Sequence, residues 1–265
     1  MRLRVCSTLA LLGLLAAIAW AQRSSRVWAR YEYEMQDPVE DPPDAGRKGE
    51  FALGRLRYRS PLDGRGRYFR WGIDANKGDR VFISLLHRLT RIDVEPIETI
   101  VDISSDEIFN HPFLFAVSIG DWIITPSEAE RLRHYFHRGG FLLADDFHND
   151  REWAIFMDGM RMIDPQASIV ELADADSIFH TVFDMTNRIR VPGANVVHGS
   201  GIERGGITPH WRAVLDSKGR IIAAVTFNQD IGDGWEFADE PDYPERFSSE
   251  AIRLGVNYVI YAMTH

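Results

Sequence analysis

Two stretches of acidic, amide and histidine side chains each follow an apolar run of the sequence, and both could carry chemistry. The first directly follows residues 141–144 and contains four candidate catalytic residues: Asp145, Asp146, His148 and Glu152. Carboxylate and imidazole groups can ligate a divalent metal or act as general acid and base. A structural alternative stays open, in which Asp146 or Asn149 caps the helix expected over the next residues.

The second stretch follows residues 221–227 and combines oxygen ligands with an aromatic ring. Its candidate ligand-binding residues are Asn228, Asp230, Asp233, Trp235 and Glu236. Polar groups beside an indole ring are typical of a carbohydrate pocket, and the acids could form an irregular calcium site. A regular calcium loop is excluded because Ile231 would occupy a ligand position. The alternative is an exposed loop whose glycines make tight turns.

Other chemical signals are weak or absent. His134 and His137 could ligate a metal, but histidines in a last helical turn more often interact with the negative helix end. Nucleophile-elbow, phosphate-loop and His-Glu-x-x-His motifs are missing. No metal site can therefore be assigned from the sequence, and we expect no cofactor. The alternative that stays open is a bound divalent metal.

The apolar pattern predicts the elements that would position these residues. Residues 112–119 form a continuous apolar run typical of a buried strand. Thr125 begins a helix with a capping box, and the glycines at 139–140 end it before the next strand at 141–144. A strand–helix–strand unit of this kind indicates a layered α/β fold, in which ligands bind at the carboxyl ends of the strands.

Further elements are expected on both sides of this unit. Residues 53–59 predict a strand with Arg55, Arg57 and Arg59 on one side, and a helix carries the apolar residues 81–89. Residues 211–216 and 221–227 predict a hairpin, which adds an antiparallel strand to a mostly parallel sheet. Ser248 is expected to cap a final buried helix over residues 250–262.

The first 50 residues indicate export followed by a linker. Arg2 and Arg4, an apolar run over residues 9–20 and a small-residue cleavage site predict a signal peptide over residues 1–21. The alternative, a retained membrane anchor, is disfavoured because 12 apolar residues rise only ~18 Å as a helix. We expect residues 22–50 to be an N-terminal segment with an acidic, proline-rich linker, and residues 51–265 to be a single domain.

The composition restricts which partners and which cellular compartment we expect for this protein. The chain of 265 residues is 45% hydrophobic and 26% charged, which fits a globular domain. Its net charge of -9 excludes a nucleic-acid partner and a polybasic membrane tether. The single cysteine, Cys6, lies within the predicted signal peptide, so the mature chain would have no thiol nucleophile. We expect a periplasmic or extracellular protein with no membrane span after signal cleavage.

Several motifs together resemble one bacterial family. They are the stretch from Arg138 to Phe147 with Glu152 and Trp153, the spacing Asn228-x-Asp230-x-Gly-Asp233-Gly-Trp-Glu236, and residues 254–265. Over residues 51–265 the chain resembles the domain of unknown function family 4159. The resemblance implies a three-layer, flavodoxin-like fold related to class I glutamine amidotransferases and similar to trehalose-utilisation-type domains. In those amidotransferases a cysteine follows a central strand. Here Asp145 and Asp146 stand at that turn, so amidotransferase activity is excluded.

These observations favour an exported, amidotransferase-like domain without catalytic activity, which would serve as a ligand-binding or interaction module of the cell envelope. Its partner would be an envelope protein, a small molecule or a carbohydrate. The alternative is a metal-assisted hydrolase or carbohydrate-active enzyme that uses both acidic loops. Only the alternative requires at least three of the candidate side chains to converge on one point.

Overall fold

The computed structural model describes residues 29–265, so the predicted signal peptide lies outside the described residues. The chain divides after Glu34, and the described part of the first unit is the 3-10 helix η1 (Ala29–Glu34). The second unit, Met35–His265, contains the sheet and all the helices that follow. Across residues 29–265, none of the helices combines the length and apolar character that a membrane span requires.

A seven-stranded sheet runs through the second unit in the order β2-β1-β3-β4-β7-β6-β5. Five neighbouring strands are parallel: β2 (Thr99–Asp102), β1 (Gly54–Arg57), β3 (Phe113–Val117), β4 (Phe141–Asp145) and β7 (Ile221–Phe227). Strand β6 (His210–Leu215) is antiparallel to both β7 and β5 (Ser168–Glu171). The predicted α/β class and the predicted antiparallel hairpin are therefore confirmed.

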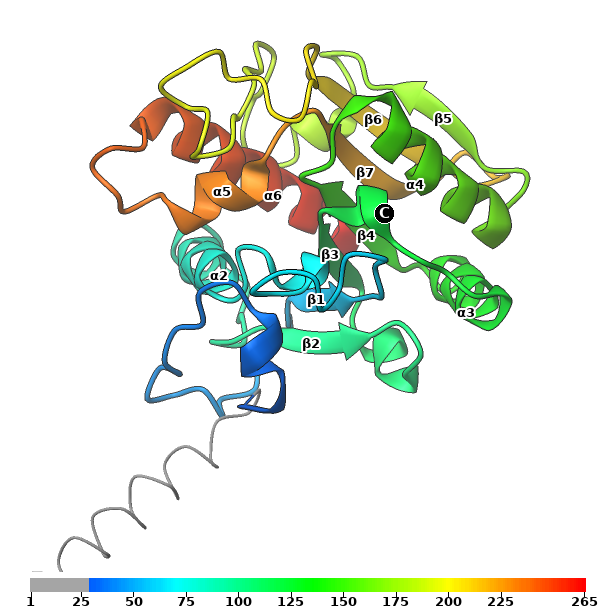
Figure 1. The fold of residues 1–265 in the computed structure, drawn as a ribbon, viewed down its shortest axis with the longest axis horizontal. Coiled ribbons are helices and arrows are strands. Elements are labelled where there is room, and N and C mark those ends of the chain that lie inside the picture. The colour runs from blue at the N-terminus through cyan, green and yellow to red at the C-terminus, as the bar shows by residue number, and fades with distance from the viewer. Residues whose placement is uncertain (1–28) are drawn as a thin grey trace, which may run out of the picture. The chain divides into compact units, whose positions relative to one another are not determined.

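Helices cover both faces of the sheet (Figure 1). One face carries α2 (Lys77–Leu89), α5 (Ile231–Glu236) and α6 (Glu245–Thr264), which pack against one another. The other carries α3 (Pro126–His137) and α4 (Asn149–Ile163). Short 3-10 helices join these elements: η2 (Arg70–Gly72), η3 (Asp106–Asn110), η4 (Ile119–Asp121) and η5 (Ser177–Phe179). Every residue of β3, β4 and β7 is buried, so these strands form the centre of the core.

The start of α3 has the predicted capping box. The Thr125 hydroxyl accepts a hydrogen bond from Glu128 N, and Glu128 Oε2 accepts one from Thr125 N at 2.7 Å. Pro126 occupies the first turn, where its missing N–H costs nothing. Local sequence alone therefore fixes where this helix begins.

The prediction for the start of α6 was wrong. The helix begins at Glu245 with Pro244 at its N-cap, and Ser248 lies inside its first turn. The Ser248 hydroxyl donates to the Glu245 carbonyl at 3.1 Å and does not cap free N–H groups. A serine can bond back to the preceding turn as readily as it caps, so its type did not decide the boundary.

The proline-rich segment, residues 37–50, makes polar contacts with the rest of the second unit. Residues 37–50 form no helix or strand, as the composition predicts. Val39 N nevertheless donates to Asn76 Oδ1 at 2.9 Å, and Asp41 Oδ1 pairs with Arg80 Nη2 at 2.9 Å. Glu50 N donates to the Asp93 carbonyl at 2.8 Å. Polar contacts therefore order a segment that has little apolar surface to bury.

A buried ion pair fixes β1 against α2. Arg55 and Asp79 have no exposed surface, and the Arg55 Nε and Nη2 atoms donate to the two Asp79 carboxylate oxygens at 3.0 and 2.9 Å. The Arg55 guanidinium also lies 4.7 Å from the ring centre of Phe115. Arg55, the first of the three arginines predicted on one side of this strand, is therefore buried in the core. A buried charge requires a partner of opposite charge, which Asp79 provides.

Candidate functional site

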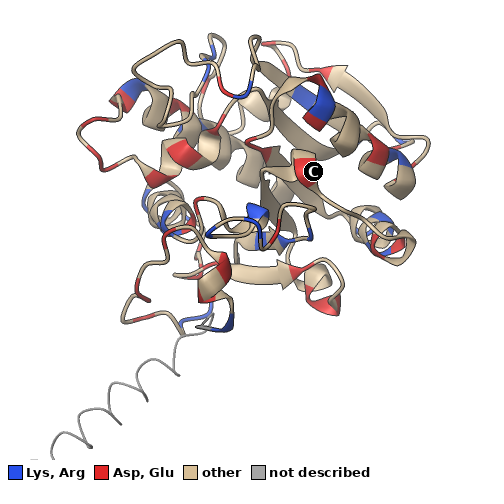
Figure 2. Ribbon diagram, viewed as in Figure 1, with Lys and Arg blue, Asp and Glu red and all other residues tan. Residues whose placement is uncertain are grey.

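The carboxyl ends of β3, β4 and β7 meet at one edge of the sheet, and the candidate site lies there. The residues directly after these strands are Ser118, Asp146 and Asn228, with φ values of 51°, 50° and 61°. Left-handed backbone is uncommon for residues other than glycine and often marks functional sites. Acidic positions gather on α5 and the loops beside it (Figure 2). Asn228 N donates to the Phe147 carbonyl at 3.1 Å and Gly232 N donates to Asp145 Oδ2 at 2.8 Å, so both acidic stretches meet at this edge.

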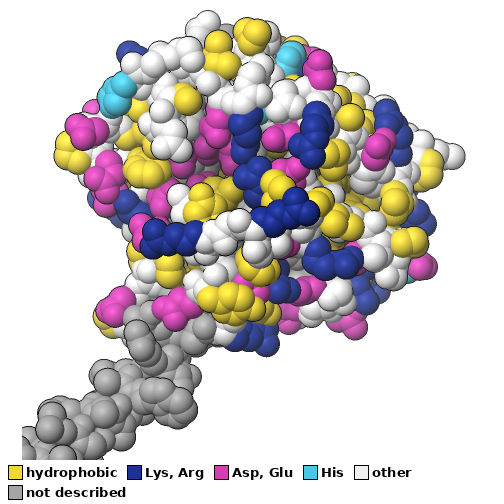
Figure 3. Space-filling model, in the orientation of Figure 1, with side chains coloured by type: hydrophobic (Ala, Val, Ile, Leu, Met, Phe, Trp, Pro, Cys, Tyr) yellow, Lys and Arg dark blue, Asp and Glu magenta, His cyan; other side chains and the backbone are white. Residues whose placement is uncertain are grey.

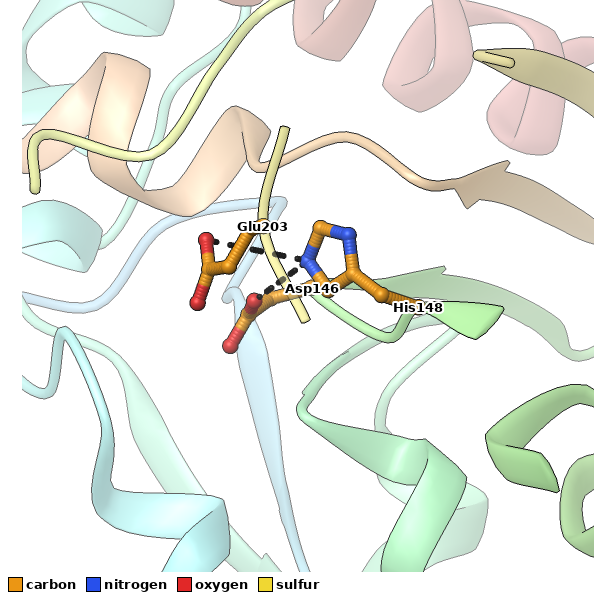
Figure 4. Close-up of side chains that lie close together, drawn as sticks. All are labelled: Asp146, His148 and Glu203. Atoms are coloured by element: carbon orange, nitrogen blue, oxygen red, sulfur yellow. Dashed lines mark hydrogen bonds and ion pairs between the residues drawn. The ribbon is translucent and has the colours of Figure 1, made fainter. Parts of the chain in front are cut away.

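Asp146, His148 and Glu203 form one cluster, which we call the histidine centre. His148 Nε2 lies 3.1 Å from Asp146 Oδ1 and 3.8 Å from Glu203 Oε2 (Figure 4). Ligands held ~2.0–2.2 Å from one cation lie roughly 3–3.5 Å apart at angles of about 90–110°. The distance between His148 and Asp146 falls in this range, and Glu203 would have to move a few tenths of an ångström closer to His148 for all three to ligate one divalent metal.

Two neighbours orient Asp146. Ser118 Oγ donates to Asp146 Oδ2 at 2.6 Å, and Arg204 Nη2 donates to Asp146 Oδ1 at 2.7 Å. Burial would raise the pKa of Asp146, but the Arg204 charge and the hydrogen bonds from His148 and Ser118 outweigh burial and lower it to about 2. Asp146 is therefore ionised, as a metal ligand must be.

Arg204 can remain in place when a metal binds. A carboxylate oxygen has two lone pairs, and Asp146 Oδ1 now accepts from Arg204 and from His148 Nε2. A metal on His148 Nε2 removes that second hydrogen bond and frees one lone pair of Oδ1. Arg204 also lies 3.6 Å from Glu152 Oε1, so it holds several acids of the site in position.

Glu152 and Asn149 cap α4 and do not join the histidine centre. Glu152 Oε2 accepts from His148 N at 2.7 Å, while Asn149 Oδ1 accepts from Arg151 N and Glu152 N at 3.0 and 3.3 Å. The capping alternative thus holds for Asn149 and not for Asp146. His148 itself occupies the N-cap position, with its side chain turned towards Asp146.

Asp145, the last residue of β4, is hydrogen-bonded to both β7 and α5. Its Oδ1 accepts from Thr226 Oγ1 of β7 at 2.5 Å, and its Oδ2 accepts from Gly232 N of α5 at 2.8 Å. Burial raises the pKa of Asp145 to about 7, although these hydrogen bonds act in the opposite direction. Asp145 therefore supports the site and does not belong to either cluster of possible metal ligands.

Asp74, Asp233 and Glu236 form a second cluster, which we call the carboxylate centre. All three side chains are buried, and one oxygen of each lies within 4.8 Å of the other two. Burial, followed by repulsion from neighbouring carboxylates, raises the pKa of Asp74 well above its usual value and that of Glu236 to about 7. Burial likewise raises the pKa of Asp233 to about 6.

The second acidic stretch is not the exposed loop of the structural alternative. Residues 231–236 form the helix α5, and Asp230 caps it by accepting from Asp233 N at 2.8 Å. Asp233 and Glu236 therefore project from one face of a buried helix, one turn apart. Burial and the neighbouring acids raise the pKa of Asp230 well above its usual value.

The two centres adjoin at Gly193. A Cβ atom at this position would lie 2.5 Å from Glu203 Oε2, 3.1 Å from Asp230 Oδ2 and 3.3 Å from Asp233 Oδ2. The three carboxylates therefore lie close to Gly193, and a larger residue there would require the Glu203 carboxylate to move. On the face shown in Figure 3, acidic side chains lie among the upper loops with basic side chains beside them.

Trp235 does not play the role predicted for it, whereas Asn228 lines the polar cavity described below. Trp235 is fully buried, stacks on Phe82 with ring centres 4.0 Å apart and donates from Nε1 to the Ala251 carbonyl. It is therefore a core residue and cannot contact a sugar. Asn228 Oδ1 accepts from Asn149 N at 3.0 Å and joins the two acidic loops.

A polar cavity of about 500 Å³ lies beside the segments that carry His148 and Arg204. Its wall includes Asn149, which follows His148, and Gly205, which follows Arg204. The ring of Trp153 also lines it, with the Arg212 guanidinium 4.3 Å from the ring centre. Trp153 thus provides the aromatic ring that was expected from Trp235, and Asn149 and the predicted Asn228 provide amide groups.

Sequence reasoning missed Asp74, Glu203 and Arg204. Each is distant in sequence from the two acidic stretches, and no spacing pattern connects them. A left-handed φ of 58° at Asp74 and 45° at Arg204 distinguishes two of them, but only in the structure. His134 and His137, the other predicted metal candidates, are exposed on α3 and belong to neither cluster.

The family described as domain of unknown function (DUF4159) matches residues 52–263. The chain belongs to the DUF4159 family. No curated protein matches the chain. The DUF4159 match includes Asp74, Asp146, His148, Glu203 and the α5 acids, so both centres lie within the DUF4159 domain.

Proposed function

We propose that this DUF4159 domain is a divalent-metal-dependent hydrolase, with its metal held by the histidine centre. One observation carries the proposal: the side chains of Asp146, His148 and Glu203 converge from two separate segments at metal-ligand spacing. One imidazole and two carboxylates suit Zn²⁺ or Mn²⁺. This proposal favours the enzyme alternative over the non-catalytic module.

The chain's own residues would perform most of the positioning. A divalent cation supplies Lewis acidity towards a carbonyl or phosphoryl oxygen and lowers the pKa of bound water. Ser118 and Arg204 fix the Asp146 carboxylate from both sides. Glu203 has 24% of its side chain exposed whereas His148 has 2%, so a substrate would reach the centre from the Glu203 side.

The neighbouring cavity supports a small polar substrate of the carbohydrate type. Trp153 offers an aromatic ring, while Asn149 and His210 offer hydrogen-bonding groups around the same space. Hydrolysis of an ester, amide or phosphate substituent would add water across that bond, with one proton ending on the leaving group. Cavities of a few hundred Å³ with a few convergent polar groups are typical of ligand sites.

The proposal also includes a flavodoxin-like fold and export from the cytoplasm. The strand order 2-1-3-4 is that of doubly wound, flavodoxin-like folds, whose ligands bind at the carboxyl edge. This order supports a relation to class I glutamine amidotransferases, but a mature chain without Cys6 would contain no thiol for their reaction. The signal-peptide pattern of residues 1–21 supports export to the periplasm or beyond the cell.

The test compares two histidines in the full chain. The protein is stripped with EDTA, reloaded with Zn²⁺ or Mn²⁺ and assayed for bound metal and for hydrolysis of acetylated hexosamines, nitrophenyl acetate and nitrophenyl phosphate. We expect His148→Ala to weaken metal binding at least tenfold and to abolish turnover. His134→Ala, on the exposed side of α3, should change neither. Unchanged metal binding in His148→Ala would refute the proposal.

The same assay tests a second candidate, a metal-dependent ligand-binding module. The engagement of the neighbouring acids favours this candidate: Glu152 accepts from His148 N, and Asp145 accepts from Thr226 Oγ1 and Gly232 N, so neither carboxylate is free to act as a general base. Metal binding that depends on His148, thermal stabilisation by a saccharide only in the presence of metal, and no turnover of any substrate would establish this module instead.

A further inference from the structure

We propose that the carboxylate centre, Asp74, Asp233 and Glu236, binds a second divalent cation, one that prefers oxygen ligands. The decisive observation concerns Asp74. Its side chain is buried, and neither carboxylate oxygen has a hydrogen-bond partner. Glu236 Oε2 is also buried without a partner. Buried carboxylate oxygens are normally paired or hydrogen-bonded, so these three atoms indicate a missing ligand.

Two basic side chains, Arg55 and Lys77, act electrostatically on the carboxylate centre, but each forms its ion pair with another acid. Arg55 acts electrostatically on both Asp74 and Glu236, but its guanidinium is bound by the two oxygens of Asp79. Lys77 acts on Glu236, yet its ammonium group lies 3.0 Å from Glu240 Oε1. Neither cation is therefore bonded directly to an acid of the carboxylate centre in these contacts.

Rigid backbone elements hold the three acids in place. Asp74 lies just before α2, while Asp233 and Glu236 lie on α5. A Cβ atom at Gly78 of α2 would be 3.5 Å from the Cβ atoms of both Asp74 and Glu236, so the two helices pack closely here. A side chain at Gly232 would collide with Asp74 Oδ2. The packing of α2 against α5 keeps the three acids together, and a bound cation would offset their repulsion.

The donor set determines which cation fits. All three ligands are carboxylates, and such sites suit Mg²⁺, Ca²⁺ or Mn²⁺. The histidine centre differs because its imidazole also accepts Zn²⁺. The second cation is independent of the proposed hydrolase activity, since it rests on other residues.

Counting bound Mn²⁺ tests the inference, because Mn²⁺ accepts both donor sets. The full chain is stripped with EDTA and titrated with Mn²⁺, and the free ion is followed by electron paramagnetic resonance. We expect two ions per chain for the wild type and one for each of Asp74→Asn and His148→Ala. Ca²⁺ should displace one of the two ions. Asp239→Asn, at an exposed acid near α5, is the matched control and should bind two.

Each outcome decides between the two proposals. Two ions bound by both Asp74→Asn and Glu236→Gln would overturn the second site, as would a single wild-type ion that is lost only in His148→Ala. A single ion lost in Asp74→Asn but kept in His148→Ala would support the second site and refute the histidine centre. Glu236→Gln replaces Asp74→Asn if thermal melting shows that the latter does not fold.

Discussion

Replacing Gly193 by alanine should disrupt metal binding while leaving the fold intact. The new methyl group would lie 2.5 Å from Glu203 Oε2, closer than any stable carbon–oxygen contact. Glu203 must therefore move by several tenths of an ångström. Metal–ligand distances are defined to about 0.2 Å, so a shift of that size that takes Glu203 away from His148 Nε2 removes it from the ligand set.

The expected magnitudes differ for binding and for stability. Loss or misplacement of one ligand should weaken metal binding by at least about tenfold, equivalent to about 1.4 kcal/mol. The colliding group is the tip of a flexible side chain, so unfolding should become easier by only about 1 kcal/mol. For a domain of this size that corresponds to a melting shift of about 2–4 °C.

Gly199→Ala is the matched control in the same loop. Its Cβ would contact only the Val196 carbonyl oxygen at 3.6 Å, an ordinary van der Waals distance. The assay is an Mn²⁺ titration of both EDTA-stripped variants, with thermal melting of each. Wild-type metal affinity in a folded Gly193→Ala protein would show that Glu203 is not a ligand and would refute the reasoning.

Three further predictions concern the fold. Asp79→Asn leaves the buried Arg55 charge without its counter-ion, which should cost about 3–5 kcal/mol in urea unfolding; a loss below ~1 kcal/mol would contradict this. Asn257→Ala removes the Oδ1 acceptor that binds the N–H groups of Val182 and of the next residue, so we expect a loss of roughly 2 kcal/mol or more by the same measurement. For Glu98, burial raises the folded-state pKa to about 7, so its contribution to stability is complete below pH ~4.5 and falls as pH rises to 7. Glu98→Gln should therefore gain stability relative to the wild type between pH 5 and 7, and parallel melting profiles would disprove it.

Local sequence was sufficient where neighbouring residues alone decide the structure. The start of α3 was predictable because Thr125 and Glu128 bond to each other's backbone within a single turn. The β6–β7 hairpin was predictable for a similar reason, since both strands and their turn are contiguous. Ser248 failed as a start signal because the same hydroxyl can bond forwards or backwards along the chain.

The sequence by itself determined the class of fold and the chemical types available at the carboxyl edge of the sheet. It placed Asp146, His148 and the α5 acids after strands that must end together, because parallel strands share that edge. Tertiary structure alone decided which of these side chains meet. Asp74 and Glu203 come from segments with no pattern of their own, and packing brings them to the site. Packing also buries Trp235 against Phe82, which no spacing along the chain could reveal.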